Sequence, residues 1–335
     1  MLTLEKLRRG IRGQEAESDA IEARRQQISR TWTSRMRLEG LIELRRGGPR
    51  SLFLVHDGEG ETLLYLNLAR RMPSDFSVFA FEPRRVAGVP LAHTTLEDMA
   101  AFYIEKMRKK QPHGPYLLGG LCAGGVIAYE MACQLTNAGE TVELVALLEA
   151  ALPNAPERPG RATELRLARL KLAITQPEKR DRGRPLRTLF AVAAILRKTL
   201  NVPLWRVSEW GKQLSARARF RVLRRILKRK AAWPRFVPSL SVREIYDRAQ
   251  ARYTPKPLPI TSILLVRAQS GEGDDTPYRD IYADGTFGWN TIARVKVVDV
   301  DGGHSTMLED RFVDSVAKAL LPYLEADHFK SEASR

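Results

Sequence analysis

The sequence predicts an α/β protein with a mostly parallel β-sheet that is covered by helices on both faces. Two observations support this prediction. From residue 51 onward, short apolar runs such as Leu52-Phe53-Leu54-Val55 alternate with longer helix-like stretches. Wholly apolar runs of this length are typical of strands buried on both faces. The alternation stops at residues 156–235 and resumes after Ser241. We therefore expect one α/β core that is interrupted by an inserted segment.

Seven elements are expected before the interruption. In chain order they are a strand at 52–55, a helix at 62–72, a strand at 78–81, a helix from about 94 to 110, a strand ending at 116–118, a helix at 126–135 and a strand at 142–148. The second helix begins with a T-x-x-E capping signal, Thr94 to Glu97. After Ser241 the core continues with a helix, strands at 263–266 and 295–300, and a helix at 311–325.

This order predicts three parts of the chain. The core covers residues 46–155 and 236–327, and the insertion covers residues 156–235. Three helices are indicated in the insertion, at about 162–174, 186–200 and 204–231. The last of them carries separate apolar and basic faces, with Phe220, Leu223 and Leu227 on the first and Arg221, Arg225 and Lys228 on the second. Residues 1–45 are polar and helix-prone, so we expect an amphipathic or partly disordered lead-in, or a docking segment.

Length and composition fit a soluble protein of a reducing compartment. The 335 residues are 44% hydrophobic, which is ample for a large core, and there are only two cysteines. No secretory signal is found at residues 1–10, and the longest apolar run, residues 189–196, is too short to span a bilayer. We therefore expect a cytoplasmic protein without a transmembrane segment.

The net charge of +16 is concentrated in the insertion. Residues 156–235 hold 23 Lys and Arg against 5 Asp and Glu, a net charge of +18. The rest of the chain then holds 32 basic and 34 acidic residues. The basic charge therefore belongs to one segment of an otherwise neutral protein, which indicates that this segment has a partner of its own.

A motif with a candidate catalytic residue joins the third predicted strand to the helix that follows it. Gly120-Leu121-Cys122-Ala123-Gly124 is a G-x-x-x-G frame with a nucleophile-type residue at its centre. Glycines let the chain turn sharply there, and the central side chain is lifted to the top of the sheet. The helix N-terminus behind it favours negative charge, which lowers a thiol pKa and stabilises an oxyanion. We predict that Cys122 is a nucleophile. A buried free cysteine and a phosphate-binding turn are the alternatives.

A nucleophile of this kind needs a base, and the base needs an orienting acid. His304 follows the last strand directly, after two glycines that let its loop bend into a cleft. The other histidines fit less well, since they close the first strand, lie in loops before the nucleophile or lie in the tail: His56, His93, His113 and His328. We predict that His304 is the base.

The predicted acid is Glu149, at the end of the strand that follows the nucleophile's helix. It interrupts the apolar run 144–151 at the edge of a parallel sheet where sites assemble. The alternative acids are Asp274, Asp275 and Asp301. For the oxyanion hole we expect the backbone N–H groups of Gly58, in the loop after the first strand, and of Ala123.

Together these motifs resemble the thioesterase domains of nonribosomal peptide and polyketide synthases, which have the α/β-hydrolase fold. The resemblance covers roughly residues 41–155 and 240–325. It rests on the first strand with His56 and its Gly-containing loop, the G-x-C-x-G turn, Glu149 and Gly303-His304, and on the stretches Leu41-Ile42-Glu43-Leu44-Arg45-Arg46-Gly47-Gly48, Tyr253-Thr254-Pro255-Lys256-Pro257 and Asp284-Gly285-Thr286-Phe287-Gly288-Trp289.

The chain departs from the family pattern at three places. Cys122 replaces the common serine, and Glu149 replaces the common aspartate, which lengthens the acid by one methylene. Asp57 and Glu59 replace residues that are usually proline and glycine, which adds negative charge near the oxyanion site. No carrier-protein motif is found in residues 1–45, so we expect a free-standing enzyme or a fragment of a larger synthase.

The resemblance implies an acyltransferase reaction without a metal or cofactor of the protein's own. An acyl or peptidyl chain would move from the phosphopantetheine thioester of a carrier protein to Cys122, and then to water, an amine or an intramolecular nucleophile. Because the chain on sulfur stays a thioester, we hypothesise that an amine or strained intramolecular nucleophile is favoured over water. The alternatives are a non-catalytic protein that binds a carrier or a membrane surface, and an editing type II thioesterase.

In this family the inserted segment forms a lid over the cleft. Carrier proteins are typically acidic, so a lid with a net charge of +18 is suited to steer one toward the site. We expect Arg221, Arg224, Arg225 and Lys228 to face the carrier or substrate. A solvated helix face ranks second, an anionic membrane surface third, and nucleic acid last, so no nucleic-acid partner is expected.

Overall fold

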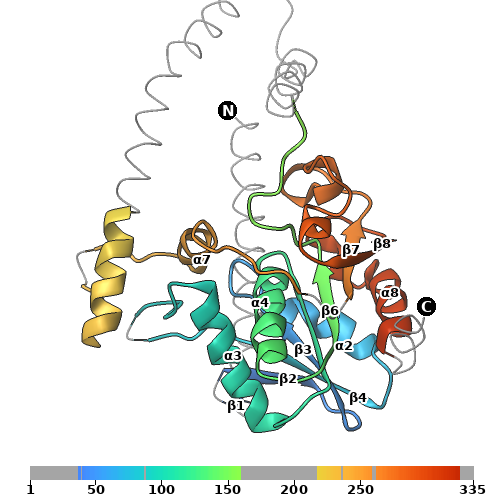
Figure 1. Cartoon of the computed structure of the whole chain (residues 1–335), viewed down its shortest axis with the longest axis horizontal. Coiled ribbons are helices and arrows are strands. Elements are labelled where there is room, and N and C mark those ends of the chain that lie inside the picture. The colour runs from blue at the N-terminus through green and yellow to red at the C-terminus, as the bar shows by residue number, and fades with distance from the viewer. Residues whose placement is uncertain are drawn as a thin grey trace, which may run out of the picture.

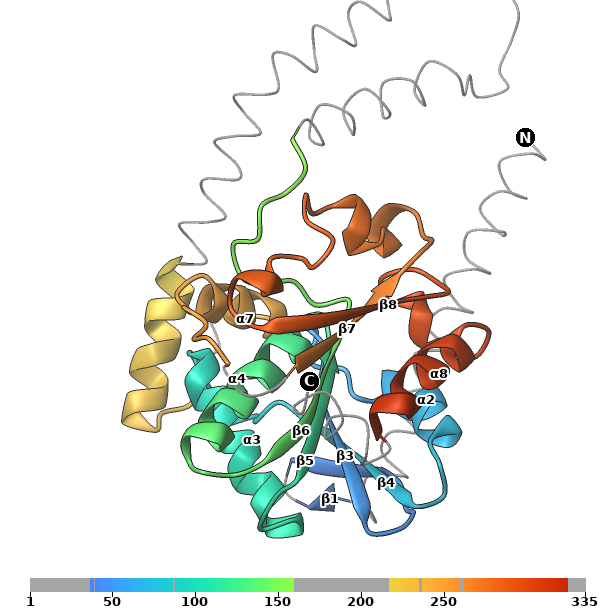
Figure 2. The same ribbon diagram turned by 45° about the vertical axis from the view of Figure 1, so that its right-hand side comes forward.

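A computed structural model describes residues 37–38, 40–86, 88–159, 217–234, 237–258 and 262–324. Helices lie on both sides of one twisted sheet, with α3 and α4 on one side and α2 and α8 on the other (Figures 1 and 2). The helices expected at 162–174 and 186–200, and the first part of the one at 204–231, lie outside the described residues.

The sheet is mostly parallel, as the alternation of elements predicts. Its strands lie in the order β1-β2-β4-β3-β5-β6-β7-β8. Their bounds are β1 Arg37–Leu38, β2 Leu41–Arg45, β3 Arg50–Val55, β4 Phe76–Phe81, β5 Tyr116–Leu121, β6 Val142–Leu148, β7 Ser262–Ala268 and β8 Arg294–Val300. The pairs β1–β2 and β2–β4 are antiparallel, and the other pairs, from β4 to β8, are parallel. The carboxyl ends of the parallel strands therefore meet at one edge.

The sheet begins earlier in the chain than the sequence analysis predicts. Strand β2 lies within residues 1–45, which we expected to be a polar, helix-prone lead-in, and its Leu41 and Ile42 are buried. Both pair with the end of β4. A short strand that is only partly buried carries too weak a pattern to be distinguished from polar helix-prone sequence. Residues 1–36 lie outside the described part.

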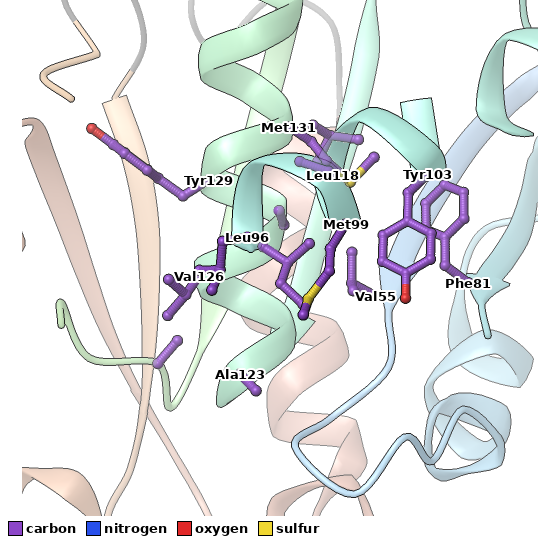
Figure 3. Packing of buried hydrophobic residues seen from close by; sticks show 14 of the residues in the cluster. Val55, Phe81, Leu96, Met99, Tyr103, Leu118, Ala123, Val126, Tyr129 and Met131 are labelled. Atoms are coloured by element: carbon purple, nitrogen blue, oxygen red, sulfur yellow. The ribbon is translucent and has the colours of Figure 1, made fainter. Parts of the chain in front are cut away.

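Alternating side chains of the strands divide the core into two layers. In β3, Phe53 and Val55 point to the side of α3 and α4, whereas Leu52 and Leu54 point to the side of α2 and α8. Figure 3 shows the first layer, in which Val55 and Leu118 of the sheet lie among Met99, Tyr103 and other side chains of the two helices. Burial of this kind stabilises a fold by roughly 25 cal/mol per Å² of apolar surface.

The helices lie close to the expected positions. Their bounds are α2 Leu66–Arg71, α3 Leu96–Lys110, α4 Ala123–Asn137, α7 Val242–Gln250 and α8 Val313–Leu324. Helix α3 is capped one residue later than expected, because the side chain of Thr95 rather than Thr94 accepts from the amide of Asp98. In α7, Ser241 and Glu244 form a capping box. No described helix is long and apolar enough to cross a membrane.

One helix of the insertion, residues 217–229, belongs to the described part. Phe220 and Leu223 are buried in the first core layer, and Arg219 forms an ion pair of 2.7 Å with Glu244 of α7. Figures 1 and 2 show this helix beside α7, on the α3 and α4 side of the sheet. The expected apolar face therefore packs on the core, although Ile226 is buried more fully than Leu227.

Candidate active site

Cys122 lies at the sharp turn between β5 and α4. Its backbone has φ 53° and ψ −115°, a conformation that non-glycine residues rarely adopt. Its amide donates to the carbonyl of Leu148 at the end of β6, over 2.9 Å. Below the turn, the buried Tyr65 hydroxyl donates to Val55 O and accepts from the Leu121 amide, each over 2.7 Å. These contacts fix the turn between neighbouring strands.

The two glycines of the frame are required because backbone atoms lie where a Cβ would stand. A Cβ on Gly124 would lie 2.4 Å from Val55 O, and a Cβ on Gly120 would lie 2.3 Å from Gly124 C. The first approach brings the N-terminus of α4 against the end of β3, where the loop with Gly58 begins. The spacing of the frame is thus explained by the close packing of α4 on β3 and β5.

Glu149 follows β6 and is completely buried, with φ 45°. Its Oε1 accepts from the amide of Ala268, and its Oε2 accepts from the amide of Tyr278, both over 2.7 Å. Oε2 also lies 3.4 Å from Nδ1 of His304. Two amides therefore hold this carboxylate so that one oxygen faces the imidazole.

His304 lies in the loop after β8, and its side chain is 14% exposed. Burial lowers the pKa of His304, but hydrogen bonds with Cys122 and Glu149 outweigh burial and raise that pKa from 6.5 to about 9. Conversely, burial raises the pKa of Cys122, but its hydrogen bond to His304 and the charge of that imidazole lower it below its usual 9.0. Both shifts favour a thiolate–imidazolium pair.

The structure thus brings together Cys122, His304 and Glu149, and it gives the alternative acids other places. Asp275 does not contact the imidazole; its carboxylate accepts from the amides of Ser305 and Thr306 and from the Thr306 hydroxyl. Its carbonyl accepts from the His304 amide over 3.0 Å. Asp275 therefore holds the loop that presents His304. Asp301 is exposed, and the side chain of Asp274 lies outside the described residues.

The other described histidines are not part of this group. Burial lowers the pKa of two of them, and one is exposed. His56 is buried against Tyr103, and burial lowers its pKa. Burial also lowers the pKa of His93 to about 4. His113 is exposed beside Glu140, and His328 lies outside the described residues.

Gly58 and Ala123 offer the backbone N–H groups expected for an oxyanion hole. Ala123 is the first residue of α4, so its amide has no acceptor within the helix. Gly58 is buried in the loop after β3, and its amide donates no hydrogen bond to the residues that the structure describes. These are the donors that a developing oxyanion needs.

The two acidic residues beside Gly58 are each satisfied elsewhere. The Asp57 carboxylate accepts from the amides of Glu59 and Glu61, each over 2.9 Å. These hydrogen bonds hold it within its own loop. Glu59 pairs with Arg243 of α7. The Arg243 guanidinium lies 3.0 Å from where a Cβ of Gly58 would stand. A cation from α7 therefore offsets the negative charge that the sequence places near this loop.

Two residues of the site have no signal in the sequence. Tyr278 begins the 3₁₀ helix Tyr278–Asp280, and Arg243 belongs to α7. Both are far from Cys122 in the sequence, and only the folding of the chain brings them to the site.

Among the described residues, no three His, Cys, Asp or Glu side chains are grouped as metal ligands would be.

Known proteins share sequence and fold with this chain. The family model described as thioesterase domain matches residues 50–323. Polyketide synthase 1 of Metarhizium brunneum is 41% identical over 117 residues, which are 33% of this chain and 5% of that protein. Non-reducing polyketide synthase terA of Aspergillus terreus is 40% identical over 105 residues, 31% of this chain and 5% of that protein. Inactive atromentin synthetase invA6 of Paxillus involutus is 38% identical over 98 residues, 29% of this chain and 10% of that protein.

Solved structures extend the likeness to most of the chain. A four-domain nonribosomal peptide synthetase, holo-AB3403 bound to AMP and glycine, matches with a TM-score of 0.51 and 27% identity, over 84% of this chain and 20% of that one. The NocB thioesterase domain, in a covalent complex with a fluorophosphonate nocardicin G analogue, matches with a TM-score of 0.50 and 23% identity, over 84% of this chain and 96% of that one. The second match shows a shared fold. This chain spans a tenth or less of the length of the curated relatives named above.

Proposed function

The chain belongs to the thioesterase domain family, with the α/β-hydrolase fold, and we propose that it transfers an acyl or peptidyl chain through Cys122 during natural-product biosynthesis. The donor is the phosphopantetheine thioester of a carrier protein. The similar proteins are large synthases and a four-domain synthetase, which supports a carrier protein as the partner. The single observation that carries the proposal is that Cys122 and His304 meet at one place, since Tyr278 contacts both of them and the buried Glu149 carboxylate lies beside the imidazole.

The first step follows from the ion pair. The Cys122 thiolate attacks the thioester carbonyl, and the carbonyl electron pair moves to oxygen, which then accepts hydrogen bonds from the backbone N–H groups of Gly58 and Ala123. Collapse breaks the bond between the carbonyl carbon and the pantetheine sulfur. The pantetheine thiolate takes the proton of the His304 imidazolium and leaves as a thiol.

The second step, deacylation, repeats the same chemistry in the opposite direction, with a new nucleophile that attacks the acyl-enzyme. Neutral His304 takes a proton from water, an amine or a hydroxyl group of the bound chain, and that nucleophile attacks the Cys122 thioester. The carbon–sulfur bond breaks, and the thiolate is regenerated beside the imidazolium. Throughout the cycle Glu149 holds Nδ1 of the imidazole, which keeps Nε2 free for the reacting groups.

Replacement of the nucleophile tests this function directly, because the chain has a second cysteine as a matched control. Cys133 is 4% exposed, and burial raises its pKa to about 12. We expect release of free thiol from an acyl-pantetheine thioester to be lost in Cys122→Ala and retained in Cys133→Ala. Equal thiol release by Cys122→Ala and the wild type would contradict the proposal, and no release above background by the wild type would leave a binding protein on the hydrolase scaffold.

We further propose that the acceptor is an amine or an intramolecular nucleophile. The support is the sulfur itself, because an acyl chain on Cys122 stays a thioester, which amines attack more readily than an ester. Incubation of the enzyme with an acyl-pantetheine thioester and a panel of amines should give amide in excess of free acid. Free acid as the sole product for every amine, and no cyclic product from a chain with an internal amine, would leave a hydrolase of the editing type.

The basic helix 217–229 is proposed to receive the carrier. Its apolar side is packed on the core, whereas Arg221, Arg224, Arg225 and Lys228 are exposed. No acidic group of the described residues lies within ion-pair distance of these four side chains. Four available cations on one fixed helix are suited to attract an acidic carrier and to raise its association rate.

A further inference from the structure

Tyr278 contacts all three members of the constellation around Cys122. Its hydroxyl lies 3.2 Å from the Cys122 sulfur. Its ring stacks on the imidazole of His304, with centroids 4.4 Å apart and planes inclined by 25°. Its amide donates to Oε2 of Glu149. We propose that Tyr278 is a fourth catalytic residue, whose hydroxyl donates a hydrogen bond to the Cys122 sulfur whenever that sulfur carries charge.

The direction of this hydrogen bond follows from the surroundings of the two groups. Burial raises the pKa of Tyr278 above its usual 10.0, so the phenol keeps its proton. Burial also raises the pKa of Cys122, but its hydrogen bond to His304 and the charge of that imidazole lower it below its usual 9.0, so the sulfur loses its proton more readily than the phenol does. A protonated phenol beside a thiolate can only donate, and bonds to charged acceptors are stronger than bonds to neutral ones.

The phenol is held in this place from several sides. The Tyr282 ring packs edge-on against Tyr278 at 5.2 Å, and the Phe287 ring does so at 5.9 Å. With the amide bonded to Glu149 and the ring stacked on His304, the hydroxyl has little freedom to turn away from Cys122. A group placed in this way is preorganised for charge that appears on the sulfur.

The hydroxyl then acts in opposite ways on the two steps of the proposed reaction, on which this inference rests. During acylation the sulfur gives its electron pair to the carbonyl carbon and loses its charge, so the hydrogen bond weakens. During deacylation the carbon–sulfur bond breaks, its electron pair returns to sulfur, and the hydrogen bond forms again. Tyr278 therefore keeps the resting thiolate populated and assists its departure as the leaving group.

The substitution Tyr278→Phe removes the hydroxyl and keeps both the ring and the amide. The first measurement is the rate of Cys122 alkylation by iodoacetamide as a function of pH, followed by mass spectrometry. Loss of one hydrogen bond to a charged group should raise the midpoint of this pH profile by about one pH unit. At pH values below the midpoint, alkylation should be about tenfold slower. Tyr282→Phe, the same change on the neighbouring ring, should leave the midpoint in place. An unchanged midpoint in Tyr278→Phe would overturn the inference.

Single-turnover kinetics separate the two steps. Above the thiol midpoint, Tyr278→Phe should acylate as fast as the wild type, whereas deacylation should be about tenfold slower, so that the acyl-enzyme accumulates. Equal slowing of both steps with an unchanged midpoint would show a packing role and overturn the inference. Failure of the wild type to form any acyl-enzyme would instead refute the proposed function, while the alkylation profile would still decide whether Tyr278 bonds the thiolate.

Discussion

The carboxyl edge of the sheet and the outer face of helix 217–229 are built in different ways. At the edge, Cys122, Glu149 and His304 are placed by the backbone: strained φ angles, close glycine approaches and amides that hold a buried carboxylate. On helix 217–229, by contrast, the backbone is an ordinary helix, and the character of the surface comes from exposed arginine and lysine side chains.

Under the proposed function, this difference assigns the reaction to the sheet edge and the choice of partner to the helix. A reaction that needs atoms placed to within fractions of an ångström depends on the close packing of α4 on β3 and β5. Long-range attraction of a charged partner needs only the sum of several charges, which tolerates movement of each side chain. Substitutions at the sheet edge should therefore abolish turnover, and substitutions on the helix should only change its rate with one kind of substrate.

The largest expected effect is at the glycine frame. In Gly124→Ala the new Cβ would lie 2.4 Å from Val55 O and 2.5 Å from His56 O, and backbone atoms cannot turn aside as a side chain does. We expect a loss of about 3 kcal/mol or more in the free energy of unfolding, with loss of activity. Arg224→Ala, on the exposed face, should stay within about 0.5 kcal/mol of the wild type. Denaturant titrations of both variants measure the difference, and a fully stable Gly124→Ala would contradict this view of the turn.

A smaller but still large effect is expected for the orienting acid. Glu149→Gln keeps the shape of the side chain but removes its charge and brings an amide group where two backbone donors already point. We expect kcat to fall by about 10²-fold or more, with a smaller change in KM, because the imidazolium loses its partner. Steady-state assays with an acyl-pantetheine thioester test this, and a wild-type kcat would show that another group orients His304.

The pH dependence tests the thiolate–imidazolium pair itself. The thiolate is present above the lowered pKa of Cys122, and the imidazolium that protonates the leaving thiol is lost as the pH rises through about 9, the raised pKa of His304. Turnover should therefore rise as the pH passes through the lowered pKa of Cys122 and fall about tenfold per unit above pH 9. Rates corrected for spontaneous thioester hydrolysis are needed. A rate that climbs steadily to pH 10.5 would be incompatible with imidazolium as the proton donor.

The smallest effect is expected on the helix. Reversal of charge at Arg224, Arg225 and Lys228 to glutamate should lower kcat/KM for a carrier-bound chain by about tenfold at low salt, through a slower encounter. Turnover of the small acyl-pantetheine thioester should not change, and added salt should reduce the difference between variant and wild type. An equal loss on both substrates would refute steering of the carrier by this surface.

The sequence predicts the parts of this molecule that are governed by local rules. The alternation of strands and helices and the Gly-x-Cys-x-Gly frame are readable because each depends on neighbouring residues. His304 and Glu149 follow from their positions at strand ends in a parallel sheet. Tyr278 could not be predicted, since a segment with no periodic pattern brings it to the sulfur. Arg243 could not be predicted because it reaches Gly58 from helix α7, which is far from that loop in the sequence. The same reason hides the role of Asp275 in holding the His304 loop.

The most direct test of the central claim is to locate the acyl chain on the protein during one turnover. After rapid mixing of the enzyme with one equivalent of acyl-pantetheine thioester and acid quenching, peptide mapping by mass spectrometry should find the acyl mass on the peptide that carries Cys122, together with a burst of one free thiol per enzyme. The acyl mass should be absent in Cys122→Ala. Full turnover with the acyl mass on another residue, or on none, would contradict the account.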